Sequence, residues 1–130
     1  MPADLVADAA IRTTCTRYCQ RCDDGDFSGW AELFAEDATF SVLGRTHEGR
    51  EACRAFIEAA MPPERRGKHF LGQSEVDIDG DEATAVSDYL FIAKVDGGGY
   101  AITSAGRYHD RLVREADGEW RFKSREIVFL

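Results

Sequence analysis

A cluster of carboxylates ends the first stretch of helical sequence. Asp23, Asp24 and Asp26 stand in the run Asp-Asp-Gly-Asp, where we expect the last turn of a helix and the turn that follows it. A carboxylate at a helix C-terminus faces the negative end of the helix dipole, which costs about 0.3–1 kcal/mol. Either these side chains are solvated turn residues, or one of them points into the fold and holds or accepts a proton.

One of the three histidines stands in an apolar setting. His69 opens a strand-like segment and is followed at once by Phe70 and Leu71, which favours a half-buried imidazole. His47 falls in an expected turn and His109 among charged residues, so we expect both to be exposed. A lone histidine can be purely structural. Beside a buried carboxylate it becomes a candidate general base, because the carboxylate fixes its tautomer and raises its basicity.

Two further polar side chains could share a site with such a pair. Tyr18 lies five residues before Asp23 on the apolar face of the first helix, either as a core aromatic or as a hydrogen-bond donor at the same cavity. Arg125 lies in the last strand, where apolar residues occupy even positions first and odd positions later. The alternation therefore leaves open which way its guanidinium points. If it points inward, it needs a carboxylate or an anionic transition state as its partner.

Three cysteines lie within eight residues and the fourth stands alone at Cys53. Cys19 and Cys22 have the Cys-x-x-Cys spacing of half a zinc or redox motif, but no second pair follows and His47 is not at a ligand spacing. Disulfides are rare in cytoplasmic proteins, and free cysteine packs as a small apolar residue. We therefore expect no metal site, and we interpret the cluster, with Cys15, as the packing face of a helix.

The first half of the chain is predicted to be mainly helical. A helix over residues 4–24 places Ile11, Cys15, Tyr18 and Cys22 on one face, and Gly25 is a suitable C-terminal cap. The other expected elements are a short helix over residues 27–36 capped by Ser28, a strand over 38–43, a turn and short strand ending at Gly49, and a helix over 51–61 that Pro62 and Pro63 close.

The second half is predicted to be a meander of strands. Residues 68–78, 83–95, 100–114 and 119–129 are strand-like and are joined by turn-rich sequence. Helices first and strands later indicate an α+β fold in which a curved sheet folds over helices. Gly72 and Gly106, inside strands, suggest the bulges or bends that such curvature needs. No repeat or linker divides residues 1–130, so we expect one domain.

The charge and hydropathy of the chain argue against several classes of protein. Sixteen Lys and Arg against 24 Asp and Glu give a net charge of −8 and a pI near 4.8, which disfavours nucleic-acid binding. No apolar run approaches the ~20 residues that span a bilayer. The first residues lack the features of a signal peptide, so we expect a cytoplasmic location.

The spacing of several motifs resembles one family. The run Y-x-x-x-x-D-D-G-D-F-x-x-W-x-x-L-F-x-x-D-A-x-F over residues 18–40 resembles the opening of the SnoaL-like branch of the nuclear transport factor 2-like (NTF2-like) superfamily. Residues 49–52 resemble the start of its third helix, residues 68–72 its first long strand, and residues 106–113 and 118–122 its closing hairpin. The resemblance implies a cone-shaped α+β barrel: a curved antiparallel sheet wraps around a long N-terminal helix, with two further helices, and encloses a pocket.

The resemblance also implies a site. Scytalone dehydratase, bile acid 7α-dehydratase and hexachlorocyclohexane dehydrochlorinase are members of this branch that use an Asp–His pair without a cofactor. Asp23 and His69, 46 residues apart, match that pair. A tyrosine of the bile acid enzyme matches Tyr18, and an arginine of the dehydrochlorinase matches Arg125. The four candidates singled out by their chemistry thus coincide with one family's site.

Differences from these members narrow the range of expected substrates. Scytalone dehydratase has a tyrosine directly before the Asp, where this chain has Cys22, and a second pocket histidine with no match here. The dehydrochlorinase has a lysine where Tyr18 stands. Neither scytalone nor a halogenated compound is therefore the expected substrate, and Tyr18 points to elimination of an alcohol.

The expected function is that of a cofactor-independent lyase or isomerase, dehydratase-like, acting on a small, largely apolar ring or polyketide- or steroid-like substrate. His69 is the expected base and Asp23 its orienting partner. Tyr18 would donate to a leaving hydroxyl or enolate oxygen, and Arg125 would stabilise negative charge or form a salt bridge with Asp23. The expected wall of the pocket consists of Phe40, Phe56, Phe70, Tyr89, Tyr100 and Tyr108.

Two other functions stay open on the same fold. One is a non-catalytic module that binds a small ligand, since fold does not fix function. The other is an epoxide hydrolase or polyketide cyclase; epoxide hydrolases on this fold use a carboxylate–Arg–carboxylate set, for which Asp88 is the nearest second carboxylate. In each case we expect a homo-oligomer, because an open curved sheet leaves a broad face to cover. The resemblance to the lyases, which are trimers, favours a trimer over a dimer.

Overall fold

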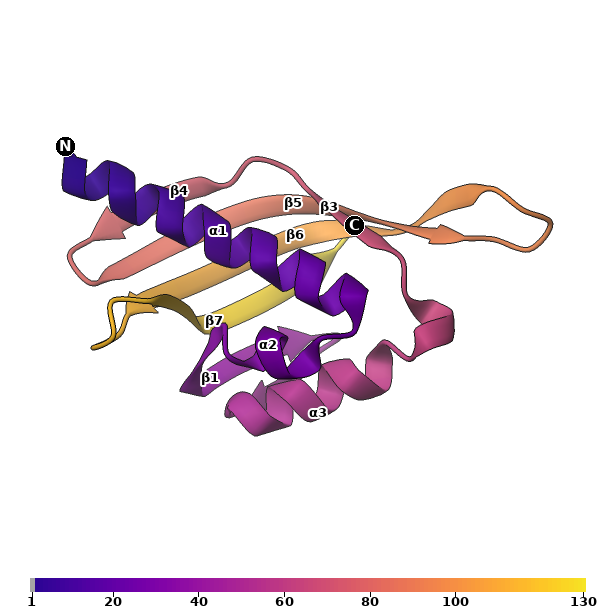
Figure 1. Ribbon diagram of the computed structural model, residues 1–130, viewed down its shortest axis with the longest axis horizontal. Helices are drawn as coiled ribbons and strands as arrows, with labels where there is room; N and C mark the ends of the chain where they lie inside the picture. Colours follow the sequence, from indigo (N-terminus) through magenta and orange to yellow (C-terminus); the bar gives the residue numbers. More distant parts are fainter. Residues whose placement is uncertain (1) are drawn as a thin grey trace.

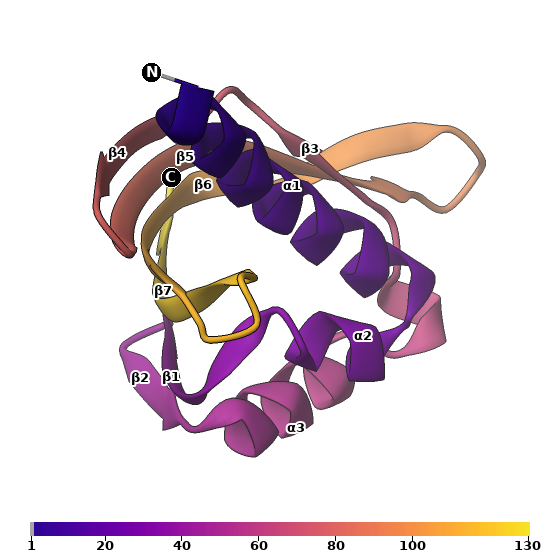
Figure 2. The same cartoon turned by 60° about the vertical axis from the view of Figure 1, so that its left-hand side comes forward.

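Helix α1 (Pro2–Asp24) lies across the concave side of one curved sheet, as Figures 1 and 2 show. The computed structural model describes the backbone of residues 2–130 and the side chains of residues 4–130. The elements that follow α1 are α2 (Phe27–Ala31), β1 (Phe34–Val42), β2 (Arg45–Glu48), α3 (Arg50–Ala60), a 3-10 turn (Pro63–Arg65), β3 (Lys68–Leu71), β4 (Glu75–Asp79), β5 (Glu82–Lys94), β6 (Tyr100–Arg114) and β7 (Trp120–Phe129). No helix among these is long and apolar enough to cross a membrane.

The seven strands form one sheet in the order β2-β1-β7-β6-β5-β3, with β4 also paired to β5. All pairs are antiparallel except β1 with β7, which is parallel. The sheet curves around α1, while α2 and α3 lie beside its β1 end, and the tip of the β5–β6 hairpin projects from the body (Figures 1 and 2). The expected α+β fold, with a long N-terminal helix and a curved sheet, is confirmed.

The buried face of α1 is the one that its periodicity predicts. Ile11, Cys15, Tyr18 and Cys22 are each at most 1% exposed. The helix ends at Gly25, whose φ of 73° suits the left-handed cap position, with the next N–H donating back to a carbonyl of the last turn. This stop leaves residue 23 in the last turn, facing the sheet.

Two boundaries differ from the sequence prediction. The second helix is only five residues long and is capped by Asp26, whose carboxylate accepts from the N–H of Gly29 at 2.9 Å, in place of Ser28. Strand β1 already begins at Phe34, because pairing with Phe122 of β7 outweighs the local helical pattern.

The segment predicted as one strand over residues 68–78 is two strands. Both pair with β5, and they are separated at Gly72, whose N–H donates to the carbonyl of Asp88. The bend expected there is present. Gly106 marks a close approach and not a bulge, because a Cβ at this position would lie 2.6 Å from the carbonyl oxygen of Val128 and 2.9 Å from the Tyr89 ring.

A β-bulge in β7 decides the orientation of Arg125. Strand β7 pairs with β6 through Phe122 and then Ser124, so that Lys123 is an extra residue. Because of this extra residue, even-numbered side chains face the concave side before the bulge and odd-numbered side chains face it afterwards. Phe122 before it and Arg125 and Ile127 after it therefore all point to the concave side, which explains the change of alternation in the sequence.

Arg125 is a fully buried cation paired with Asp110 of β6. Its Nε and Nη2 donate to the two carboxylate oxygens at 2.7 Å each, and both side chains are 0% exposed. The guanidinium carbon lies 4.2 Å from the ring centroid of Tyr18, 3.9 Å from that of Tyr108 and 4.4 Å from that of Phe122. Burial alone would lower the pKa of Arg125, but the charge of Asp110 and the hydrogen bonds to it hold that pKa well above its ordinary value.

The four cysteines are all buried and none forms a disulfide. Burial raises the pKa of Cys15 and Cys53 to about 11 and that of Cys19 and Cys22 to about 12. In the part of the chain that the structure describes, no group of three His, Cys, Asp or Glu side chains could hold a metal ion. The Cys-x-x-Cys pair is therefore a packing feature of α1.

We predict that the native thiols react slowly with Ellman's reagent at neutral to mildly alkaline pH, because thiolate is the reactive form and burial suppresses it. All four thiols should react at once after unfolding in guanidinium chloride. Since the folded pKa values are raised above the ordinary value of 9.0, the free energy of unfolding should fall as pH rises from about 9 towards 11. Rapid labelling of two or more native thiols would contradict this packing.

We predict that Asp110→Asn lowers the free energy of unfolding by about 3–5 kcal/mol, because it leaves the charge of Arg125 buried without a counter-charge. Urea denaturation followed by tryptophan fluorescence measures the loss. Asp88→Asn is the matched control, since it breaks another Asp–Arg pair between neighbouring strands of the sheet, with Arg107 across β5 and β6, but at the exposed surface. Equal, small losses in both variants would show that the buried pair contributes no more to the free energy of unfolding than the exposed pair does.

Candidate active site

The carboxylate of Asp23 joins the end of α1 to the start of β3. Oδ1 lies 2.6 Å from Nδ1 of His69, and Oδ2 accepts from the backbone N–H of the same residue at 3.0 Å. The two side chains are only 4% and 11% exposed. The cost of placing a carboxylate at a helix C-terminus is thus offset by two hydrogen bonds in a largely dry setting.

This geometry fixes the tautomer of His69. An ionised carboxylate can only accept, so the neutral imidazole carries its proton on Nδ1 and keeps its lone pair on Nε2. The ring lies edge-on to Phe91 at 4.7 Å between centroids and 6.3 Å from the ring of Tyr18. His69 also lines a cavity that is partly open to the surface. It therefore presents a basic nitrogen in an apolar space, with a carboxylate behind it.

The cavity has a volume of about 240 Å³ and a mainly apolar lining with a few polar groups. The hydroxyl and imidazole groups come from α1, β3, β5 and β6: Tyr18, His69, Tyr89, Ser104 and Tyr108. Most of the apolar groups come from β1, α3 and β7: Phe40, Val42, Phe56, Ile57, Ala60, Ile127 and Phe129. A ligand held here would therefore have an apolar body with a few polar groups.

Two phenols lie beside the Asp–His pair at the bottom of the cavity. Tyr18 and Tyr108 are each 1% exposed, and their ring centroids lie 5.6 Å apart. Burial raises the pKa of both phenols well above the ordinary value, and the charge of Arg125 opposes that rise only in part. Both therefore stay protonated at neutral pH and can act as hydrogen-bond donors.

Four of the six predicted wall residues line the cavity: Phe40, Phe56, Tyr89 and Tyr108. Phe70 and Tyr100 do not; they are 59% and 72% exposed. Phe70 follows His69 on the same strand and so points to the opposite face.

Tyr100 points outward because of a second β-bulge. Strand β6 pairs with β5 through Ile102 and then Ser104, so that Thr103 is an extra residue and reverses the parity. Ser104 and Tyr108, beyond the bulge, face the cavity, whereas Tyr100 lies on the projecting hairpin. Sequence reasoning missed Ser104, although it shares its parity with Tyr108.

Arg125 does not reach the cavity wall, because the rings of Tyr18 and Tyr108 lie over its guanidinium. The expected salt bridge to Asp23 is wrong: Arg125 pairs with Asp110, and Asp23 pairs with His69. The sequence analysis also missed Asp110, for which the signal was its shared parity with Tyr108 in β6.

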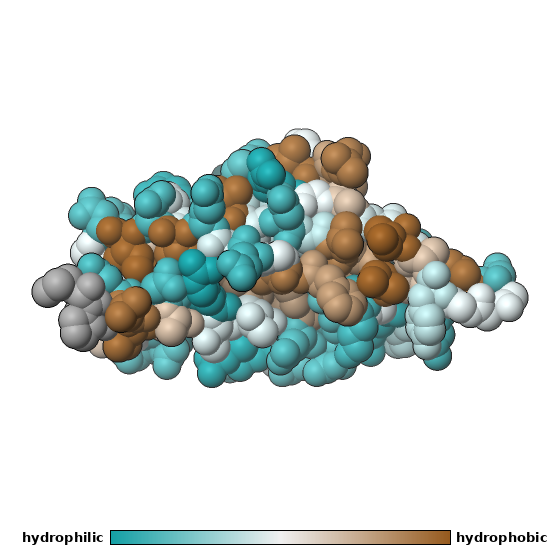
Figure 3. Space-filling model, turned by 90° about the horizontal axis from the view of Figure 1, so that it is seen from above, coloured by the Kyte–Doolittle hydropathy of each residue, from teal (hydrophilic) through white to brown (hydrophobic). Residues whose placement is uncertain are grey.

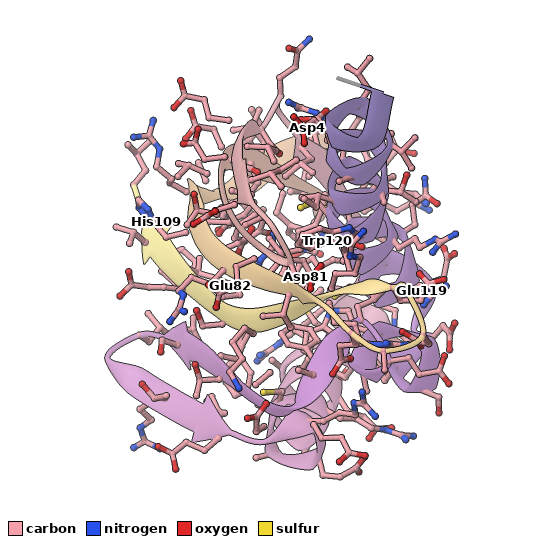
Figure 4. The ribbon with its side chains drawn as sticks, turned by 90° about the vertical axis from the view of Figure 1, so that its left-hand side faces the viewer. Asp4, Asp81, Glu82, His109, Glu119 and Trp120 are labelled. Atoms are coloured by element: carbon pink, nitrogen blue, oxygen red, sulfur yellow. The ribbon has the colours of Figure 1, made fainter. Side chains whose placement is uncertain are left out.

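The other two histidines lie away from this pair. His109 is exposed on the outer side of the sheet, away from α1, whereas Trp120 of the neighbouring strand lies on the side that faces α1 (Figure 4). His47 was expected to be exposed but is half-buried, because its ring stacks on Phe56 at 4.3 Å. Asp88, the candidate second carboxylate, is exposed and bound to Arg107 on the outer face.

Comparisons with known proteins agree on the fold. Rv3472 from Mycobacterium tuberculosis, described as a protein of unknown function and solved as a variant, superimposes with a TM-score of 0.92 at 32% identity, over 99% of this chain and 75% of that one. A candidate scytalone dehydratase from Novosphingobium aromaticivorans gives a TM-score of 0.84 at 28% identity, over 100% and 89% of the two chains. The anthranilate 1,2-dioxygenase small subunit of Burkholderia cepacia is 22% identical over 130 residues, which cover 87% of this chain and 80% of the relative.

A protein-family model described as a SnoaL-like domain matches residues 3–126, nearly the whole chain. The curved sheet around a long helix agrees with that assignment, as does the cavity between them. The chain belongs to the SnoaL-like domain family, which has the NTF2-like fold.

Proposed function

We propose that this protein is a cofactor-independent lyase or isomerase, dehydratase-like in its chemistry, that acts on a small and largely apolar ring compound. One observation carries the proposal. A histidine whose Nδ1 is bound by a buried carboxylate at 2.6 Å lines an otherwise mainly apolar cavity.

His69 is the general base of the proposed reaction. Its Nε2 takes a proton from the carbon next to a carbonyl group of the substrate, and Asp23 stabilises the imidazolium that forms. The electron pair left on the carbon moves into the carbonyl to give an enolate. The enolate then expels a β-hydroxyl group, which takes the proton from the imidazolium and leaves as water, or it takes that proton back at another carbon. The low exposure of the pair supports this role, because water competes little for either group.

The phenols of Tyr18 and Tyr108 are the proposed donors to oxygen atoms that gain charge. Tyr18 would donate to the leaving hydroxyl or to the enolate oxygen, as the sequence analysis expected. Arg125 is a positioning residue in this scheme: it contacts the faces of both rings and holds them in place without touching the substrate.

The alternatives have less support from the geometry. A ligand-binding module would not need an orienting carboxylate behind the imidazole. A carboxylate–Arg–carboxylate set is not assembled, because Asp23 and Arg125 belong to two separate pairs. A polyketide cyclase would use the same base and remains a variant of the proposal.

We also propose that the protein assembles with copies of itself, as a trimer more than a dimer. Apolar residues are exposed on the outer side of the sheet and on the hairpin, among them Phe70, Leu90 and Ile102 at 59%, 39% and 59%. Figure 3 shows groups of apolar residues among hydrophilic ones on the face seen from above. Light scattering of the purified chain measures the assembly directly.

We predict that the protein speeds hydrogen–deuterium exchange next to the carbonyl of one- and two-ring ketones, including 1-tetralone, in D₂O. Proton NMR follows the exchange with no need to know the native leaving group. His69→Ala should lose about 10²–10⁴-fold of the enhancement, the usual contribution of a general base, and Asp23→Asn most of it. His109→Ala, which removes an exposed imidazole, should keep the wild-type rate.

Two outcomes of this assay would reject the proposed reaction. One is that neither the wild-type chain nor any variant accelerates exchange for any ketone in the series. The other is that His69→Ala and Asp23→Asn exchange as fast as the wild-type chain.

A further inference from the structure

One pair of polar groups on the cavity wall has no role in the proposed proton transfer. The hydroxyl oxygens of Tyr89 on β5 and Ser104 on β6 lie 3.0 Å apart, and both residues line the cavity. Their strands are neighbours in the centre of the sheet, so the pair stands on a rigid support.

The pair has a hydrogen-bond donor to spare. Two hydroxyl groups carry two protons, and the bond between them uses one, whichever oxygen donates it. Burial raises the pKa of Tyr89, so its phenol stays protonated at neutral pH. The remaining O–H can therefore donate to an acceptor on a ligand in the cavity.

The position of Tyr89 is fixed by its neighbours. Its ring stacks on that of Tyr108 with centroids 4.5 Å apart and planes 6° from parallel. Gly106 leaves room for it, because a Cβ there would lie 2.9 Å from the Tyr89 ring. The centroids of Tyr89 and His69 are 6.1 Å apart. A single ligand can thus contact the imidazole at one point and the hydroxyl pair at another.

The charges around the cavity select against an anion. No Lys, Arg, Asp or Glu lines it in the part of the chain described by the structure. The nearest buried cation, Arg125, is neutralised by Asp110 and covered by aromatic rings. A carboxylate at the hydroxyl pair would be desolvated without a counter-charge, which is far more costly than burying a carbonyl or hydroxyl oxygen.

We propose that Tyr89 and Ser104 form a second polar subsite, which binds a neutral carbonyl or hydroxyl oxygen of the substrate away from the reacting carbon. The reacting end is that of the proposed function, on which this inference rests; the subsite itself requires no reaction. The substrate class is then an uncharged ring compound with two oxygen functions. A volume of about 240 Å³, below the ~300–1,000 Å³ of typical drug-sized pockets, favours one or two rings over a steroid.

Calorimetric titration with 2-naphthol and 2-naphthoate at neutral pH tests the subsite. We expect the wild-type chain to bind 2-naphthol at least tenfold more tightly than 2-naphthoate. Deleting either hydroxyl alone would free the other to donate, so the double variant Tyr89→Phe/Ser104→Ala is the test. It removes both donors and should weaken 2-naphthol binding about three- to tenfold, the usual effect of one lost hydrogen bond. Tyr100→Phe makes the same chemical change at an exposed tyrosine on the hairpin and should bind like the wild-type chain.

The proposal is overturned if 2-naphthol does not bind, if 2-naphthoate binds as tightly, or if the double variant binds 2-naphthol like the wild-type chain. Circular dichroism confirms folding of the variants, and the preference of the wild-type chain for 2-naphthol over 2-naphthoate tests the subsite without any substitution. Because the titration involves no proton abstraction, failure of the base at His69 leaves these ratios unchanged. Failure of the subsite likewise leaves the exchange assay with His69 variants unchanged.

Discussion

The two oxygen atoms of one carboxylate connect the helical half of this molecule to its sheet. Asp23 accepts from both the backbone N–H and the ring Nδ1 of His69. The first bond places the start of β3 against the end of α1, and the second sets the direction and tautomer of the imidazole. Position and protonation of the proposed base thus depend on one side chain, which is placed by the cap at Gly25 that ends the helix.

A second buried carboxylate, that of Asp110, helps to position the aromatic rings of the cavity. Asp110 neutralises Arg125, and the guanidinium then packs against the rings of Tyr18 and Tyr108. A buried pair of this kind is weak evidence for stability, since desolvation offsets much of its attraction. Its structural effect is to fix two phenols at the base of the cavity while keeping net charge away from the ligand. The cavity is consequently polar at a few points but without a formal charge of its own.

Much of this arrangement could be predicted from the sequence, and the exceptions have a common cause. The periodicity of α1 placed Tyr18 near Asp23, and the apolar setting singled out His69, but only the resemblance to a family joined these three residues as one site. The partner of Arg125 and the outward direction of Tyr100 could not be predicted, because each depends on a β-bulge that reverses strand parity. A bulge is a property of how two strands pair, and a single strand's alternation does not contain it.

The tautomer of His69 tests most directly whether Asp23 orients this residue as a base, and a long-range ¹H–¹⁵N spectrum of the histidine-labelled chain measures it. At a pH where the imidazoles are neutral, we expect a proton on Nδ1 of His69 and a pyridine-like ¹⁵N shift for Nε2. Exposed His109 serves as the reference for the mixture of tautomers found in water. Asp23→Asn should remove the preference, because an amide can also donate. A wild-type His69 protonated on Nε2 would contradict the account, because that nitrogen could not then accept a proton from a substrate.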